Sequence, residues 1–362
     1  MLRKILIVLP TDNLGGAEKV LKMITKYYIN NSNVSISVFF LQKKSTSSWD
    51  DLLINENITL DYGKSKSSAF GLISLIFFVL KCRKFHYIFS SQTIINGFIG
   101  LLIKLRLIQT KFFIARESTT VFNRFSGIKL FRYRLIYYLG YRYIDLLICQ
   151  TELMKDQFKY NLPVISKNIN IKIIPNPINL SKTVKEQTDF ILNNEYIVSA
   201  GRLIEEKGFD ILIDAFNLLK NDYSNLKLVI LGEGPLRKQL EAKIADLDLS
   251  SKVLLLGHVS NVLTYFNSAR ACVVSSRIEG FPNVVLEMMS QNTNVVSTKC
   301  AGGIDELEGV FVVEVNDIIG LVEHLKVILG SDSSHNRVLF DKELKSRNIE
   351  NFINKIELSL NE

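Results

Sequence analysis

The chain has few cysteines and histidines, and their placement excludes several classes of protein. Its four cysteines lie far apart and form no CxxC pair, and its four histidines stand singly. We therefore expect neither a disulfide framework nor a structural metal site, and the cysteine pattern favours a reducing compartment. The longest apolar run covers residues 69–80, which is shorter than the roughly 20 residues that cross a bilayer. The sequence predicts no transmembrane helix, and the short run at 5–9 lacks the features of a signal peptide.

Acidic residues are scarce in the first half of the chain. Residues 1–180 carry 25 Lys and Arg against 10 Asp and Glu, whereas residues 181–362 carry 19 against 26. The net charge of +8 is therefore the difference between a first half at +15 and a second half at −7. A chain of 362 residues also exceeds one ordinary hydrophobic core, so two domains are expected.

Short apolar runs alternate with helical patterns in both halves, which predicts an α/β fold with doubly wound parallel sheets. The predicted strands lie at 5–9, 34–41, 87–90, 111–115, 146–149, 196–200, 227–231, 253–256, 271–275 and 295–297. We expect two Rossmann-like domains that face each other across a cleft, the first at residues 1–175 and the second at 190–345. The Pro- and Asn-containing segment at 175–179 and the polar residues after it separate them. Residues 346–362 should form a C-terminal helix that packs back on the first domain.

The most specific stretch runs from Glu279 to Glu287, after a predicted buried strand. Pro282 suits the first turn of a helix, so Glu279 falls on the loop and Glu287 about one turn inside the helix. The free N–H groups of that turn favour a phosphate, and the two carboxylates can accept hydrogen bonds from sugar hydroxyls. Most Glu pairs at this spacing only solvate a helix. Here the pair lies at the carboxyl end of a strand, where open α/β sheets bind ligands.

Three further loops follow strands of the second half. Arg202 and Lys207 could neutralise a diphosphate leaving group, although two solvated cations remain an open alternative. Gly232 and Gly234 would let a flat base lie against the backbone. His258 and Val259 end the next strand and could offer backbone groups to the base edge, but a lone histidine is usually structural. Because the carboxyl ends of parallel strands share one edge, the four segments should lie together.

In the first half, Gly15 and Gly16 open a helix directly after the first strand. Glycine at this place lets a backbone N–H approach a phosphate, although most Gly-Gly turns are structural. The sequence contains neither G-x-G-x-x-G nor G-K-[ST] at this end, which disfavours a nicotinamide or ATP site.

In this order, the motifs resemble the signature of family 4 of the retaining glycosyltransferases, which have the GT-B fold. The matching segments are Gly15-Gly16-Ala17-Glu18, Gly201-Arg202 with Lys207-Gly208, Gly232 to Leu236, and Glu279 to Glu287. The resemblance implies that Arg202 and Lys207 hold the donor diphosphate, while Glu279 meets the donor sugar. It also implies that Glu287 meets the ribose and that Gly16 approaches the phosphates from the other domain. Retention of anomeric configuration, with no metal and no cofactor, is a further implication.

The full set of expected substrate contacts follows from these motifs. It comprises Gly15, Gly16, Ser118, Gly201, Gly232, Gly234, Pro235, Leu236, His258, Val259, Gly280, Phe281, Pro282, Asn283, Val284, Val285 and Glu287. The catalytic candidates are Glu279, Arg202, Lys207 and Glu117. Many relatives carry a histidine on a first-domain loop, and this chain has none between His86 and His258. Glu117 or Ser118, after the strand at 111–115, is the candidate for that region.

Residues 122–143 contain five Lys or Arg, no acid and eight aromatic residues. This composition predicts a helix in the headgroup region of an anionic bilayer, with a buried amphipathic helix as the alternative. Nucleic acid is a distant second partner for such a basic surface.

The sequence therefore predicts a hexosyltransferase that moves a sugar from a nucleotide-sugar donor to a lipid-linked saccharide in surface polysaccharide assembly. UDP-hexose or UDP-N-acetylhexosamine is the favoured donor. We expect a cytoplasmic protein, peripheral at the inner face of the plasma membrane, with no nucleic-acid partner. The alternatives are a GDP-sugar-dependent transferase, a GT-B nucleotide-sugar epimerase and a catalytically silent glycan-binding member.

Overall fold

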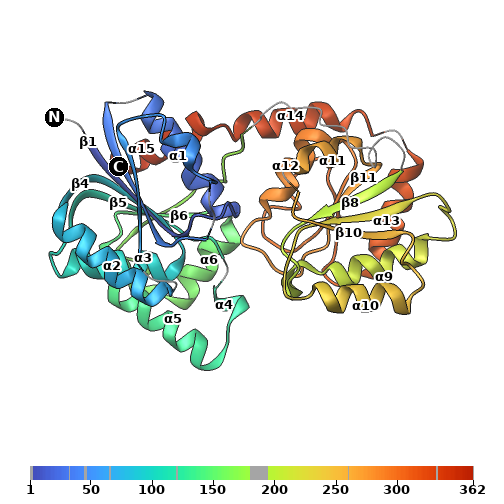
Figure 1. Ribbon diagram of the computed structural model, residues 1–362, viewed down its shortest axis with the longest axis horizontal. Helices are drawn as coiled ribbons and strands as arrows, with labels where there is room; N and C mark the ends of the chain where they lie inside the picture. Colours follow the sequence, from blue (N-terminus) through green and yellow to red (C-terminus); the bar gives the residue numbers. More distant parts are fainter. Residues whose placement is uncertain are drawn as a thin grey trace. The chain divides into compact units, whose positions relative to one another are not determined.

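The chain divides into two compact units, each with its own parallel sheet (Figure 1). Unit 1 comprises residues 1–179 and 347–362, and unit 2 comprises residues 180–346. The computed structural model describes residues 3–31, 33–44, 47–64, 67–119, 121–179, 195–259, 261–331 and 333–361. The polar residues predicted to separate the domains lie largely outside the described residues.

Unit 1 is built on a seven-stranded sheet in the order β3-β2-β1-β4-β5-β6-β7. The strands are β1 (Arg3–Thr11), β2 (Val34–Gln42), β3 (Ile58–Tyr62), β4 (Lys84–Ser91), β5 (Gln109–Arg116), β6 (Leu146–Cys149) and β7 (Asn170–Ile173). All neighbours in this sheet pair in parallel. The inner strands are nearly continuous apolar runs because helices cover both faces of the sheet.

Two groups of helices cover the two faces of this sheet (Figure 1). One face carries α2 (Ser68–Lys81), α3 (Thr93–Lys104) and α5 (Gly127–Gly140), and the other carries α1 (Gly16–Asn31) and α15 (Ile349–Asn361). Phe352, Ile353 and Ile356 of α15 are buried in one core with residues of α1. The shorter elements are η1 (Asp50–Leu52), α4 (Val121–Arg124), η2 (Tyr141–Tyr143), α6 (Glu152–Asn161) and α7 (Pro163–Ser166).

Helices α3 and α5 pack backbone against backbone at three glycines. A Cβ at Gly100 would lie 2.0 Å from the carbonyl oxygen of Gly140, and one at Gly140 would lie 1.8 Å from that of Gly97. Only glycine permits this approach. The single helix predicted at 122–143 is wrong, because the segment is divided into α4, α5 and η2. Gly127, with φ +57°, starts α5 after the break.

Unit 2 contains a six-stranded parallel sheet in the order β10-β9-β8-β11-β12-β13. Its strands are β8 (Tyr196–Ala200), β9 (Lys227–Leu231), β10 (Val253–Gly257), β11 (Ala271–Val274), β12 (Val295–Thr298) and β13 (Phe311–Val313). Its helical elements are η3 (Glu205–Lys207), α9 (Phe209–Leu219), α10 (Arg237–Asp246), α11 (Val262–Ser268), α12 (Asn283–Gln291), α13 (Ile318–Gly330) and α14 (Asn336–Ser346). Helices α9, α10 and α13 share one core against the sheet.

All ten predicted strands are present, with ends that differ by at most three residues. Strands β3, β7 and β13 were not predicted. Each lies at an edge of its sheet and is only partly buried, so it lacks the continuous apolar run that marks an inner strand. In the part of the chain that the structure describes, no helix is both long and apolar enough to cross a bilayer.

Candidate functional site

The predicted loops of unit 2 meet at the carboxyl edge of its sheet. The Gly232 amide donates to the Gly257 carbonyl at 2.7 Å, which joins the loops after β9 and β10. A Cβ at Gly232 would lie 1.9 Å from the Gly201 carbonyl oxygen, and one at Gly234 would lie 2.4 Å from that of Leu203. These glycines therefore let the loops after β8 and β9 pack together, which is a reason for glycine besides the predicted contact with a base.

Lys207 and Glu279 come together across this edge. Lys207 Nζ forms an ion pair with Glu279 Oε1, and Ser276 Oγ donates to the same oxygen at 3.1 Å. The Glu279 amide donates to the Cys300 carbonyl at 2.9 Å. The two charged side chains are 21% and 19% exposed. Both side chains are thus partly desolvated and still accessible to a ligand. The partial desolvation strengthens their electrostatic interaction with a bound ligand.

The backbone around Lys207 is fixed by the loop after β11. Gly208 has φ +60°, and a Cβ there would lie 2.1 Å from the Ser275 carbonyl oxygen. Ser275 Oγ donates to the Lys207 carbonyl at 3.0 Å. The orientation of Lys207 toward Glu279 is therefore set by close backbone packing.

An ion pair that sequence reasoning missed joins the same two loops. Arg277 donates to both carboxylate oxygens of Asp210, at 2.8 and 2.6 Å, and to the Glu205 carbonyl at 2.8 Å. Although burial alone would raise the pKa of Asp210, these hydrogen bonds and the charge of Arg277 lower it. No local pattern could reveal this pair, since the residues lie 67 positions apart.

The other predicted residues of unit 2 lie along the same loops. Arg202 is exposed, and Glu287 is partly buried on α12, about one turn after its start. Pro282 is the N-cap residue of α12, one position before the predicted first turn. Four of the predicted substrate contacts are buried: Gly280, Phe281, Pro282 and Val285. Seven are partly buried: Gly201, Gly232, Gly234, Leu236, Val259, Asn283 and Val284. Two, Pro235 and His258, are exposed.

In unit 1, Gly15 and Gly16 lie exposed at the N-terminus of α1. The side chain of Glu18 folds back toward Gly15, since a Cβ at Gly15 would lie 2.6 Å from Glu18 Oε2. Burial raises the pKa of Glu18, against hydrogen bonds from the backbone of Glu18 and Gly15 and the charge of Arg116. A carboxylate of the chain itself thus lies where a phosphate was predicted.

Glu117 lies inside unit 1. Its side chain is 2% exposed, Tyr141 donates a hydrogen bond to Oε1, and Thr93 donates to Oε2 at 3.2 Å. Burial raises the pKa of Glu117 to about 7, although the hydrogen bonds lower it. This geometry favours a structural role for the carboxylate. Ser118 is partly buried, and the predicted roles of both residues stay predictions.

Arg116, which the sequence analysis did not select, is a buried cation beside Glu117. It donates to Ser91 Oγ at 3.3 Å and to Asn176 Oδ1, and its Nε has no hydrogen-bond partner among the described residues. Burial lowers the pKa of Arg116 to about 10, and the charge of Glu18 opposes that shift. The sequence contains one signal that could have identified Arg116: it is a charged residue directly after the apolar strand predicted at 111–115.

The raised pKa of Glu117 predicts that unit 1 loses stability as the pH rises. Between about pH 4.5 and pH 7 the unfolded chain ionises this carboxyl group while the folded chain keeps its proton. The contribution of Glu117 to the free energy of unfolding is complete below the pKa that its carboxyl group has in the unfolded chain. It is lost as the pH rises through the pKa of this group in the folded chain. We expect the free energy of unfolding to fall by about 3 kcal/mol over this range through Glu117 alone.

Urea unfolding at about pH 5 and pH 8 measures this loss. Glu117→Gln should flatten the decline, because its side chain is neutral at both values. Glu152→Gln, at an exposed glutamate of α6, should retain the decline of the unchanged protein. The same decline in Glu117→Gln as in the unchanged protein would contradict the assignment.

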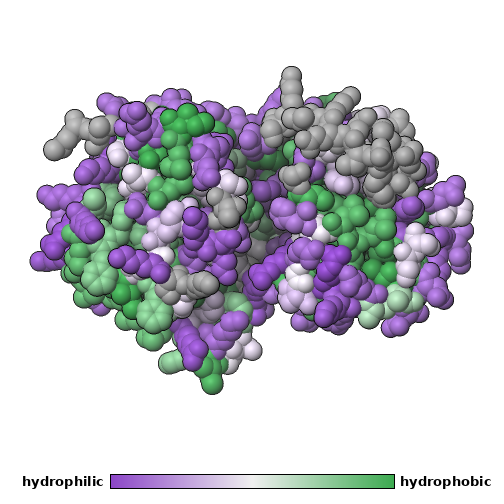
Figure 2. All heavy atoms as spheres, in the orientation of Figure 1, coloured by the Kyte–Doolittle hydropathy of each residue, from purple (hydrophilic) through white to green (hydrophobic). Residues whose placement is uncertain are grey.

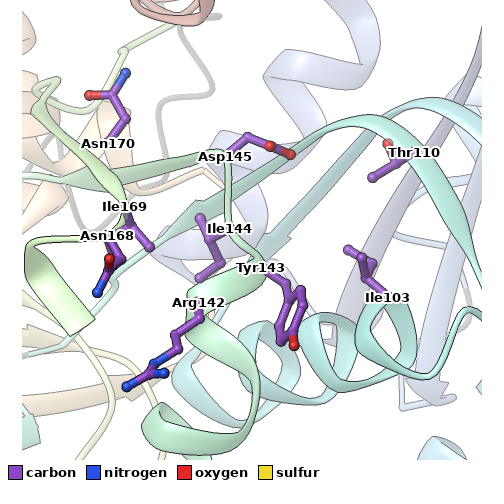
Figure 3. Close-up of a pocket in the computed structure, with 9 residues that line it drawn as sticks. All are labelled: Ile103, Thr110, Arg142, Tyr143, Ile144, Asp145, Asn168, Ile169 and Asn170. Atoms are coloured by element: carbon purple, nitrogen blue, oxygen red, sulfur yellow. The ribbon is translucent and has the colours of Figure 1, made fainter. Parts of the chain in front are cut away.

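A pocket of about 410 Å³ lies elsewhere in unit 1 (Figure 3). Its lining includes Thr110, Asp145 and Asn170, at the amino ends of β5, β6 and β7. It is therefore at the edge of the sheet opposite to Gly15, Glu117 and Ser118. Among the described residues, no group of three His, Cys, Asp or Glu side chains could hold a metal ion.

Comparison with known proteins finds a family that resembles unit 2. The profile of the family described as Glycosyl transferases group 1 matches residues 181–340. The matched segment contains Arg202, Lys207, Glu279 and Glu287, whose roles remain predictions.

Curated glycosyltransferases are similar to about half of the chain. One from Campylobacter jejuni, N-acetylgalactosamine-N,N'-diacetylbacillosaminyl-diphospho-undecaprenol 4-alpha-N-acetylgalactosaminyltransferase, is 36% identical over 199 residues. That match covers 52% of this chain and 54% of the relative. An uncharacterized glycosyltransferase of Methanocaldococcus jannaschii is 33% identical over 181 residues, or 48% of this chain and 44% of the relative. The chain therefore spans about half the length of these relatives.

Solved structures share the fold over nearly the whole chain. Anabaena HepE in complex with UDP-glucose has a TM-score of 0.77, with 99% of each chain covered and 17% sequence identity. Sucrose-phosphate synthase from Thermosynechococcus elongatus has a TM-score of 0.76, with 98% of each chain covered and 15% identity. The predicted fold class is confirmed: the chain has the two parallel-sheet domains of GT-B glycosyltransferases.

Proposed function

We propose that this protein is a retaining glycosyltransferase that moves a sugar from a nucleotide-diphospho-sugar to a lipid-linked saccharide. The observation that carries the proposal is the Lys207–Glu279 ion pair at the carboxyl edge of the unit 2 sheet. The name of the Campylobacter jejuni relative, which specifies a diphospho-undecaprenol-linked acceptor, supports a lipid-linked acceptor here. The UDP-glucose complex of HepE and the N-acetylgalactosaminyl group in the relative's name support a UDP-hexose or UDP-N-acetylhexosamine donor.

Each charged group has a separate task in this proposal. Arg202 and Lys207 neutralise the departing diphosphate, together with the free N–H groups at the start of α12. Glu279 accepts hydrogen bonds from hydroxyls of the donor sugar, and Glu287 accepts them from the ribose. The acceptor hydroxyl attacks the anomeric carbon on the face that the diphosphate leaves. The bond between the anomeric carbon and the acceptor oxygen forms as the bond between that carbon and the diphosphate oxygen breaks. The proton of the acceptor hydroxyl passes to the departing phosphate oxygen.

The ion pair also explains how donor binding could prepare the site. Lys207 is held by one carboxylate, whereas a diphosphate offers a higher negative charge and several oxygens. We expect Lys207 to turn to the diphosphate when the donor binds. Glu279 then becomes available to the sugar hydroxyls, so the two halves of the donor are recognised together.

Thermal unfolding with a panel of UDP- and GDP-sugars tests the proposal. A UDP-sugar present at about 100 times its Kd should raise Tm by roughly 3 °C. Given that donor and a lipid-linked acceptor, the protein should form a product with retained anomeric configuration. No stabilisation by any nucleotide-sugar would contradict the proposal. A GDP-sugar response, an epimerised donor, or stabilisation without turnover would favour the corresponding alternative.

A further inference from the structure

Helix α5 carries a row of apolar side chains on a face that lies in solvent. Ile128, Phe131 and Leu135 are 75%, 68% and 51% exposed, and Tyr138 and Leu139 continue the row. These positions recur every three or four residues and so share one side of the helix. The opposite side holds Tyr137, which is buried in unit 1, and Leu130 and Tyr133, which pack against the same core. The exposed row is therefore not needed to hold α5 on unit 1, and such a row is typical of an interaction surface.

Helix α2, on the same face of the sheet, repeats this arrangement. Phe70, Ile73 and Phe77 are 60%, 48% and 65% exposed and recur at the same helical spacing. Leu75 and Val79, on the other side of α2, are buried in the core that α2 shares with α3 and α5. Figure 2 shows apolar side chains, in green, at the surface where Figure 1 draws α2.

The charge around these two rows has one sign. Between Asp61 and Asp145 the sequence contains 14 Lys and Arg and one acid, Glu117, which is buried. The exposed cations on and beside the helices are Lys81, Arg83, Lys84, Lys104, Arg106, Arg124, Lys129, Arg132, Arg134 and Arg142. At 100° per residue, Arg132 and Arg134 flank the apolar row of α5 on its two sides. Long cationic side chains in such flanks can reach phosphates while the row is buried in hydrocarbon.

We propose that the outer face of α2 and α5 docks on an anionic lipid bilayer. Phe70, Phe77, Phe131 and Leu135 insert below the headgroups, and the exposed cations bind lipid phosphates. This inference rests on the proposed function, because it names the surface that brings unit 1 to a lipid-linked acceptor. The proposed docking differs from a purely electrostatic association with the bilayer, because insertion of apolar side chains supplies a large part of the binding free energy.

Charge complementarity favours a bilayer over other occupants of this surface. A second copy of the chain would bring the two cationic surfaces together, with no exposed acid on them to pair. A nucleic acid would bind the cations but would leave Ile128 and Leu135 unburied.

Vesicle flotation of the full chain, without substrates, tests the proposal. The vesicles contain phosphatidylcholine alone or equal parts of phosphatidylcholine and phosphatidylglycerol. We expect the unchanged protein to float with the anionic vesicles. The double variant Phe131→Ser with Leu135→Ser should bind them about 100-fold more weakly at both low and high salt, because two apolar groups are lost. Arg132→Glu with Arg134→Glu should weaken binding about 100-fold at low salt and far less at high salt.

Leu358→Ser is the matched control, since Leu358 is 67% exposed on α15, which covers the other face of the sheet. It should float like the unchanged protein. The proposal is overturned if the unchanged protein remains unbound to both vesicles, or if the serine double variant floats like this control. A dimer in sedimentation that the serine variant dissociates, without flotation, would also overturn it. Stabilisation by UDP-sugars reports on the proposed function independently, since it needs no vesicle.

Discussion

Glu279→Ala should lower kcat by about 1,000-fold or more, because it removes a preorganised group that is proposed to contact the reacting sugar. The loss should fall on turnover and leave binding of free UDP intact, since UDP contains no donor sugar. Binding of UDP could even become tighter, because the variant releases Lys207 from its ion pair. Turnover with a UDP-sugar, measured beside the Tm shift caused by UDP, separates the two effects.

The matched control for Glu279→Ala is Glu241→Ala. Glu241 also accepts from an arginine, at 2.8 Å from Arg237, but it lies on the exposed side of α10. This control should retain both turnover and the UDP response. Near-normal turnover in Glu279→Ala, with the fold intact, would show that the carboxylate does not contact the reacting sugar.

Lys207→Ala should lower kcat/KM by about 1,000-fold, which corresponds to about 4 kcal/mol of lost stabilisation of the departing diphosphate. In contrast to the glutamate variant, it should also lose most of the Tm shift caused by UDP. The physical reason is that Lys207 is proposed to contact the diphosphate, which free UDP contains. The opposite responses of the two variants to UDP distinguish the leaving-group contact from the sugar contact.

Two further variants exclude a merely structural role for Lys207. Lys243→Ala removes a comparable ion pair, 2.7 Å from Asp214, and should leave activity unchanged. The charge-swapped variant Lys207→Glu with Glu279→Lys retains an ion pair at the same place but reverses its orientation. It should fold and yet be inactive. Substantial activity in the swapped variant would mean that the pair only stabilises the loops after β8 and β11.

The strands and the loops of unit 2 could be predicted from the sequence because their signals are local. An inner parallel strand is a short apolar run, and the residues directly after it must lie at the carboxyl edge of the sheet. Arg202, Lys207, Gly232 and Glu279 were placed in this way. Edge strands β3, β7 and β13 escaped prediction, since half-exposed side chains carry no clear apolar run.

The environment of charged groups could not be predicted. Glu117 directly follows a strand, as a ligand-binding residue would, yet Tyr141 and Thr93 enclose its carboxylate from elements 24 positions away in each direction. The close packing of α5 on α3 could not be predicted for a similar reason. It depends on glycines of two separate elements, Gly140 with Gly97 and Gly100.

The order of apolar runs and loop motifs by itself determined the fold class and the loops that carry the candidate residues, because strand periodicity and chain direction act over short segments. The tertiary structure alone decided which charges meet. Lys207 binds Glu279 and Arg277 binds Asp210, although the nearby sequence offers each several other partners. An ion pair depends on distances of a few ångströms between separate loops, and those distances exist only after the sheet has aligned the ends of its strands.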